Sequence, residues 1–100
     1  MPQLDAILAA LTAYAPDADT DMVRRAWHFA ENVHRGQMRA SGEPYFSHPA
    51  QVAYYLTNLK LDTASVVTAL LHDTVEDTEA TLDQIETQFS PEVRALVDGV

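Results

Sequence analysis

Four side chains that could bind a metal ion or transfer protons lie close together in the sequence: His72, Asp73, Glu76 and Asp77. On a helix each residue advances by about 100°, which places Glu76, Asp73 and Asp77 within about 140° of His72 and therefore in one sector. An imidazole beside carboxylates suits a divalent ion such as Mn²⁺, Zn²⁺ or Fe²⁺. The remaining carboxylates could transfer protons. A solvated helix surface would explain the same acids equally simply.

The opposite sector of this stretch is apolar. Such a stripe is typical of a helix with one buried face, so we expect one helix that carries the four polar residues and begins at a cap formed by Asp62 or Thr63. The residues of the stripe are Val67, Leu70, Leu71, Thr74 and Val75.

A third metal-binding candidate is His48, which lies where a polar loop leads into a predicted helix. Pro49 suits the first turn of a helix, and Ser47 could cap it. Such a helix would hold His48 on a fixed backbone, although a surface histidine beside a proline is the simpler reading. Its expected buried stripe consists of Val52, Tyr55, Leu56 and Leu59.

Several short blocks of the chain, taken in order, resemble the hydrolase domain of the Rel/Spo (RelA/SpoT homologue) alarmone enzymes. These enzymes are a branch of the HD superfamily of metal-dependent phosphohydrolases. The resemblance begins near Ala26 and continues to the end of the chain. The matching blocks are Ala30–His34, Gly36–Gln37, Arg39, Ser41–Tyr45, His48–Pro49, Val52–Ala53, Leu70–Asp73, Glu76–Thr78 and Leu96–Val100.

This resemblance implies an all-α domain that hydrolyses guanosine 3′,5′-bis(diphosphate), or its pentaphosphate, at the 3′ position to give GDP or GTP plus pyrophosphate. It implies a bound Mn²⁺, or another divalent ion. By position, the implied metal ligands are His48, His72 and Asp73, and the implied catalytic acids are Glu76 and Asp77.

The same resemblance implies a substrate-binding loop. Arg39 matches an arginine on the substrate side, and its planar guanidinium suits phosphate recognition or stacking on a nucleobase. Ser41 and Tyr45 lie in the same loop and are candidates to line the nucleotide pocket. A turn-forming serine and a core aromatic are equally good explanations of these two residues.

The chain departs from the family pattern at two places. Many relatives carry a basic residue where this chain has Ala40. The fourth metal ligand of the family is an aspartate beyond the stretch that ends at Val100, and Asp98 matches a different family position. We therefore expect residues 1–100 to form a single, partial HD-type domain, truncated at its C-terminus.

Composition limits the possible partners. The chain has 15 acidic and 6 basic residues and a formal charge of -9, which argues against direct nucleic-acid binding and against an anionic membrane surface. A polyanionic nucleotide would need a local basic region, for which Arg24, Arg25, Arg35 and Arg39 are candidates. The chain has no cysteine and no membrane-length apolar run, so we expect a cytoplasmic protein.

The apolar periodicity predicts about six helical segments and no strand. Ser90 and Pro91 would begin the last helix, which shows no C-terminal cap and ends at an exposed Val100, and a homodimer through this helix is one prediction. In the second segment His34 falls on an apolar face, where we expect a packed or solvated histidine and not a ligand.

Three functions are compatible with these observations. The first is an alarmone hydrolase domain, and the second is an HD phosphohydrolase that acts on another nucleotide. The third is a helical module without activity that folds, dimerises or regulates within a longer Rel/Spo protein. The pairs His72-Asp73 and Glu76-Asp77 favour the enzymes, whereas the missing fourth ligand favours the third.

Overall fold

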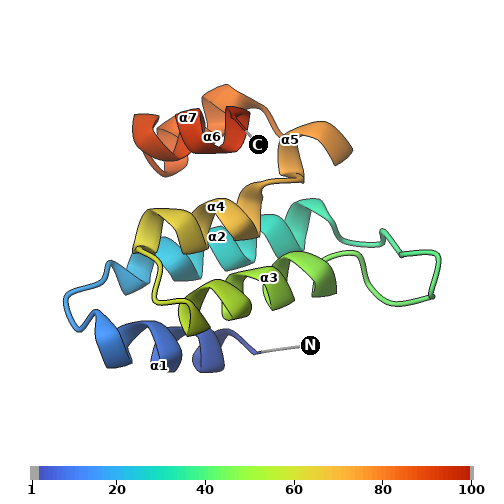
Figure 1. The fold of residues 1–100 in the computed structure, drawn as a ribbon. Coiled ribbons are helices and arrows are strands. Elements are labelled where there is room, and N and C mark those ends of the chain that lie inside the picture. Colours follow the sequence, from blue (N-terminus) through green and yellow to red (C-terminus); the bar gives the residue numbers. More distant parts are fainter. Residues whose placement is uncertain (1–2, 100) are drawn as a thin grey trace.

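The chain is all-helical, as the periodicity predicts (Figure 1). A computed structural model describes residues 3–99. Seven helices lie within that range, and the loop before α3 adds one isolated antiparallel bridge between Met38 and Pro44. The helices are α1 Leu4–Tyr14, α2 Thr20–Val33, α3 Ser47–Asn58, α4 Thr63–Leu71, α5 Thr74–Asp77, α6 Leu82–Gln88 and α7 Pro91–Asp98.

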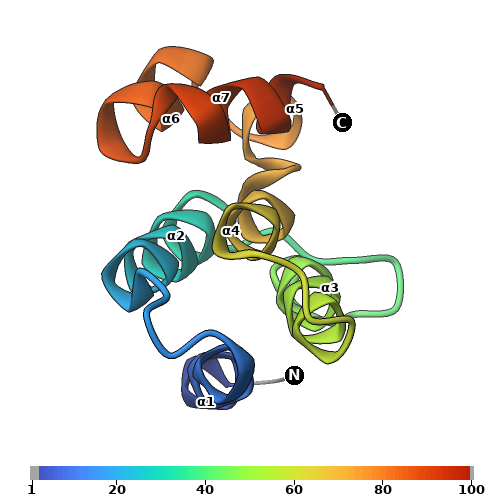
Figure 2. The ribbon, with the colours of Figure 1, turned by 60° about the vertical axis from the view of Figure 1, so that its left-hand side comes forward.

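Helix α4 lies at the centre of the molecule. It packs against α2, α3 and α7, while α1 packs against α3 and α2. Figure 2 shows α1 and the pair α6 and α7 on opposite sides of the layer formed by α2, α4 and α3. Every residue of α4 from Val66 to Leu71 is buried, so this helix connects the parts of the core.

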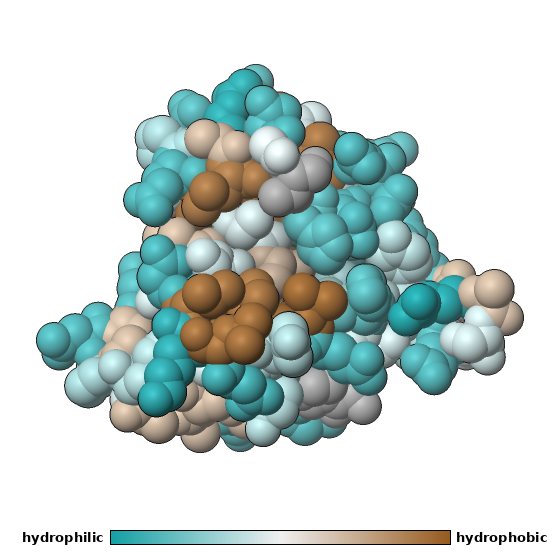
Figure 3. Space-filling view, viewed as in Figure 1, coloured by the Kyte–Doolittle hydropathy of each residue, from teal (hydrophilic) through white to brown (hydrophobic). Residues whose placement is uncertain are grey.

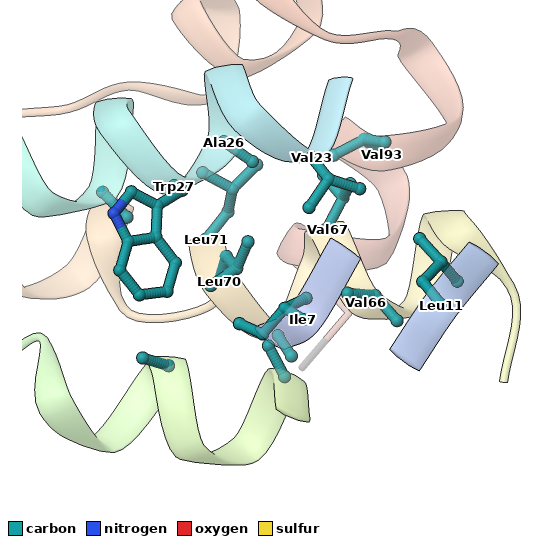
Figure 4. Close-up of a cluster of buried hydrophobic side chains, with 14 of the residues drawn as sticks. Ile7, Leu11, Val23, Ala26, Trp27, Val66, Val67, Leu70, Leu71 and Val93 are labelled. Carbon is teal, nitrogen blue, oxygen red and sulfur yellow. The ribbon is translucent and has the colours of Figure 1, made fainter. Parts of the chain in front are cut away.

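The core is made of aliphatic side chains from α1, α2, α3, α4, α6 and α7 together with one aromatic pair. The rings of Trp27 and Phe46 meet edge to face, with centroids 4.8 Å apart, which is a favoured arrangement for two aromatic rings. Figure 4 shows the aliphatic cluster around α4. Its fully buried members include Ile7, Leu11, Val23, Val66, Val67, Leu70, Leu71 and Val93.

Side-chain caps fix where the helices begin. Asp62 caps α4 and accepts a hydrogen bond from the Ser65 backbone N–H at 2.9 Å. Thr81 and Gln84 form a reciprocal capping box at α6. Ser90 caps α7, with Pro91 in its first turn. The caps expected at α4 and α7 are therefore confirmed, whereas Ser47, expected to cap α3, is the first residue of that helix and accepts no capping hydrogen bond.

The stretch expected to form one helix through His72 and Asp77 is instead divided into α4 and α5. Helix α4 ends at Leu71, and Asp73 has φ −96° and ψ −1°. Side chains occupy the carbonyls that a continuing helix would use, because Thr74 Oγ1 donates to Leu71 O at 2.8 Å and His72 Nδ1 contacts Ala69 O at 2.6 Å. Such local bonds compete with the helix ladder.

The buried face of α3 also differs from the expected stripe. Tyr55 and Leu59 are 60% and 53% exposed. The helix instead buries a row of small side chains, which allows its backbone to lie close to α4 and α1. These buried residues are Ser47, Pro49, Ala50, Ala53 and Thr57.

We expected the last helix, α7, to have no C-terminal cap, but the structure shows a capping hydrogen bond there. The Gly99 N–H donates to Ala95 O at 3.1 Å and closes the last turn of α7. Val100, which we expected to be exposed, lies outside the described residues. None of the helices within residues 3–99 has the length and apolar character needed to cross a membrane.

Candidate functional site

His72 and Asp73, which occupy the break between α4 and α5, contact one another. His72 Nε2 lies 3.1 Å from Asp73 Oδ2, and Nδ1 lies 2.6 Å from Ala69 O. A carbonyl only accepts, so Nδ1 carries the hydrogen and, in the neutral ring, Nε2 presents a lone pair to the carboxylate. The lone pair and the negative carboxylate oxygen repel one another, and a cation or a proton between the two atoms would remove this repulsion.

The donor set of this pair fits a divalent metal ion. Ligand atoms held at about 2.0–2.2 Å from one ion lie about 3 Å apart, which is close to the observed separation. The hydrogen bond from Nδ1 to a backbone carbonyl is the usual outer contact of a metal-binding histidine, and it orients the ring. His72 and Asp73 are therefore arranged as two neighbouring ligands would be.

His48 lies nearby, and its ring meets that of His72 edge to face, but His48 has no hydrogen bond or ion pair with His72 or Asp73 among the described residues. It is exposed on the first turn of α3, and the ring centroids of His48 and His72 are 6.3 Å apart. Within residues 3–99, no three histidine, cysteine, aspartate or glutamate side chains form a group that could hold a metal ion. The role of His48 as a third ligand stays a prediction.

Tyr45 connects the acids. Its hydroxyl lies 2.6 Å from Asp77 Oδ2 and 3.3 Å from Asp73 Oδ2, and its single proton is donated to the nearer oxygen. The hydrogen bond to Asp77, followed by burial and by the charge of Asp73, raises the pKa of the phenol well above its usual range. Glu76, the other predicted catalytic acid, is exposed on α5.

The loop between α2 and α3 carries Arg39 and Ser41 away from these acids. The Tyr45 N–H donates to Gln37 O at 2.9 Å and the Arg39 N–H donates to Glu43 O at 2.8 Å, which closes the loop at its base. Arg39 and Ser41 are exposed at the tip, which projects beyond the helices in Figure 1. Neither contacts His72 or the acids through a hydrogen bond or ion pair among the described residues.

Two further residues, His34 and Gln37, contact Tyr45 and Asp77, although sequence reasoning did not assign them to the site. His34 is 2% exposed and its ring stacks on Tyr45, with centroids 4.8 Å apart and planes 27° apart. His34 Nδ1 lies 3.0 Å from Gln37 Oε1, and Gln37 Nε2 donates to the Asp77 backbone carbonyl at 2.8 Å. The expectation of a packed His34 is confirmed. The only sequence signal was that His34 and Gln37 belong to the blocks that precede Arg39.

His72 and the predicted acids face different hollows. Glu76 and Asp77 line a polar groove of about 1390 Å³ between α2 and the α5 to α6 segment, together with Arg25 and Arg35. His72 lines a smaller apolar hollow of about 370 Å³ bounded by α3, α4 and α7. Figure 3 shows hydrophobic side chains gathered over α3 on this side of the molecule.

Comparison with known proteins shows the family of this chain. The family model for the HD domain matches residues 26–100. The chain therefore belongs to the HD-domain family.

Its relatives define the branch of that family. The chain is 52% identical over 90 residues to a GTP pyrophosphokinase of Myxococcus xanthus and 49% identical over 87 residues to the GTP pyrophosphokinase rsh of Brucella melitensis. It is 43% identical over 90 residues to the bifunctional (p)ppGpp synthase/hydrolase SpoT of Escherichia coli. These matches confirm the resemblance to Rel/Spo proteins.

The matches cover 87–90% of this chain but only 12–13% of each of these three relatives. The chain therefore spans about one eighth of their length.

Proposed function

We propose that this chain carries the hydrolase site for guanosine 3′,5′-bis(diphosphate) or its pentaphosphate, releasing pyrophosphate from the 3′ position. The observation that carries the proposal is the break between α4 and α5, where His72 contacts Asp73 and Tyr45 links Asp73 to Asp77. The printed name of the Escherichia coli relative includes a (p)ppGpp hydrolase, which supports this substrate for the same HD domain.

The proposed metal ligands are His72 and Asp73, with His48 as the third, and the proposed ion is Mn²⁺ or another divalent ion. Such an ion supplies Lewis-acid activation of water and of phosphate oxygens. The chain contributes the orientation of the ligands, because the Ala69 carbonyl fixes the His72 ring. Histidine nitrogen with carboxylate oxygen suits manganese better than a thiolate-seeking metal.

Glu76 and Asp77 are the proposed proton-transfer groups. Asp77 holds its carboxylate at the Tyr45 hydroxyl, and a carboxylate in a fixed position can accept a proton from water and later release it. Arg39 and Ser41 are the proposed nucleotide contacts. Their exposure at the loop tip leaves both side chains accessible to a ligand.

The first test is pyrophosphate release from guanosine tetraphosphate with and without Mn²⁺. It is run on this chain and on a chimera in which the segment that follows the matched region in the Escherichia coli SpoT relative is fused after residue 100. Manganese-dependent release by either protein supports the proposal. Bound metal without release from either protein contradicts the proposed substrate.

Variants separate the proposed roles. His72→Ala should weaken Mn²⁺ binding, measured by calorimetry, because it removes a ligand nitrogen. Glu76→Gln and Asp77→Asn should leave the ion bound and lower turnover by about 10²-fold or more, because they remove proton-transfer groups. Equal loss of metal in all three variants would contradict these assignments.

A helical interaction module without activity is the second candidate, and a specific observation favours it: no group of three metal-binding side chains forms among residues 3–99. Turnover of a different nucleotide by the chimera would favour the other enzymatic alternative. The homodimer through α7 also stays a prediction. A molecular mass that does not change with concentration in light scattering would contradict it.

A further inference from the structure

We infer that His34 is a positioning residue that fixes Asp77 at two points, through the side chain of Gln37 and through the ring of Tyr45. His34 lies at the end of α2, and it does not contact Asp77 through any hydrogen bond or ion pair among the described residues. The effect on turnover rests on the proposed function, whereas the effect on the backbone of α5 does not.

The first connection restrains the backbone of Asp77. Only the amide nitrogen of Gln37 can donate to the Asp77 carbonyl, so the amide oxygen faces His34 Nδ1. That oxygen only accepts, and therefore Nδ1 carries the hydrogen. The order of donors is thus fixed from His34 through Gln37 to Asp77, and no other orientation of the amide satisfies both contacts.

The second connection restrains the carboxylate of Asp77. The His34 ring stacks on Tyr45 and holds the phenol plane, and the Tyr45 hydroxyl donates to Asp77 Oδ2 at 2.6 Å. The Tyr45 backbone N–H is bonded to Gln37 O as well. Gln37 and Tyr45 are therefore joined by their backbones where the loop closes, and His34 contacts the side chains of both residues.

The burial of His34 indicates that its placement is specific. Its Nε2 atom is buried and has no hydrogen-bond partner among the described residues, which is unfavourable compared with a satisfied group. A phenylalanine would avoid that cost and could still stack on Tyr45. It could not bond to Gln37, and this is the property that histidine adds.

Asp77 needs outside support because its own helix provides little. Helix α5 has four residues, and such a short helix is marginal unless tertiary contacts hold it. Asp77 and Glu76 are exposed. The contacts from Gln37 to the Asp77 backbone and from Tyr45 to its carboxylate therefore hold in place the group that the proposed reaction would use.

The test compares His34→Phe and Gln37→Met with the control Asp19→Ala, which removes the side-chain cap of α2 at the opposite end of that helix from His34. Amide hydrogen exchange is measured on this chain without metal or substrate. The Asp77 and Thr78 amides, which bond to Asp73 O and Thr74 O, should exchange about fivefold to tenfold faster in the first two variants, as expected for losing one hydrogen bond. Gln37→Met serves if His34→Phe does not fold.

Unchanged exchange at Asp77 and Thr78, or an equal increase in Asp19→Ala, would overturn the inference whatever the enzyme assay gives. In whichever form of the protein is active, His34→Phe should lower kcat by about tenfold with little change in KM. It should cause no further loss in an Asp77→Asn background, because it acts through Asp77. A full additional loss in that background would also overturn it.

Discussion

The phenol of Tyr45 provides a direct check of the contacts at the scale of single residues. Asp77 raises its pKa by accepting its proton, with burial and the charge of Asp73 adding to the effect. In an alkaline titration of the metal-free protein followed by tyrosinate absorbance, Tyr45 should ionise well above the usual value of about 10. Asp77→Asn should bring it closer to that value. A Tyr45 that titrates normally would contradict the contact.

The sign of the effect on stability follows from the direction of this shift. The folded protein keeps the Tyr45 proton at a pH where the unfolded chain has lost it. The contribution to stability is therefore complete below about pH 10 and is lost as the pH rises above that value. Tyr45→Phe should remove this part of the alkaline destabilisation, measured by denaturant unfolding across that range.

The sequence predicted which residues come together at the site better than it predicted their supporting contacts. The types and spacing of His72, Asp73 and Asp77 predict metal-binding and proton-transfer groups, and these roles stay predictions; the structure shows the contact between His72 and Asp73. The contact of Tyr45 with both acids joins residues 28 and 32 positions apart, and the burial of His34 depends on how α2 meets the loop. Such contacts arise from tertiary packing and have no local periodic signal.

At the scale of elements, the cap of α4 holds the beginning of the helix that ends at His72. Asp62→Ala should lower the free energy of unfolding by about 1 kcal/mol, because the Ser65 N–H loses its acceptor. Asp62→Asn is the matched control, since it keeps a side-chain oxygen. If Asp62→Asn lowered the free energy of unfolding as much as Asp62→Ala does, the charge of Asp62, and not its capping hydrogen bond, would be responsible.

The hydrogen bonds of this cap lower the pKa of Asp62. Its contribution to stability is therefore present above the ordinary carboxyl pKa and is lost as the pH falls through the lower folded value. The start of α7 at Ser90 and Pro91 was equally local and hence predictable, whereas Ser47 does not cap α3 and the start of α5 was not expected. The end of α4 was not predictable, because periodicity continues through Thr74 and Val75 while side-chain bonds to the backbone stop the helix.

At the scale of the whole molecule, the central position of α4 makes its core residues the most sensitive. Leu70 is fully buried, and Leu70→Ala should cost about 2–5 kcal/mol in the free energy of unfolding, through lost burial and a residual cavity. Leu96→Ala, at a position 39% exposed on α7, is the control and should cost much less. Equal losses would contradict the assignment of the core.

The all-α class could be predicted because apolar spacing along each helix is a local property. The exposed face of α3 could not be predicted in this way. The close packing of small side chains, and not hydrophobicity alone, decides which face of α3 lies against α4 and α1. The large side chains Tyr55 and Leu59 suggested one face, whereas the alanines and Thr57 occupy the buried one.

The loop between Gln37 and Tyr45 has a consequence for protease digestion. Arg39 lies at its exposed tip, outside every helix, so trypsin should cut there before it cuts at Arg24 or Arg25 in α2. The helices on either side of that cut pack against each other, α1 on α3 and α2 on α4. The two fragments should therefore stay associated, and separately produced fragments should reassemble, which would allow each half of the site to be labelled on its own.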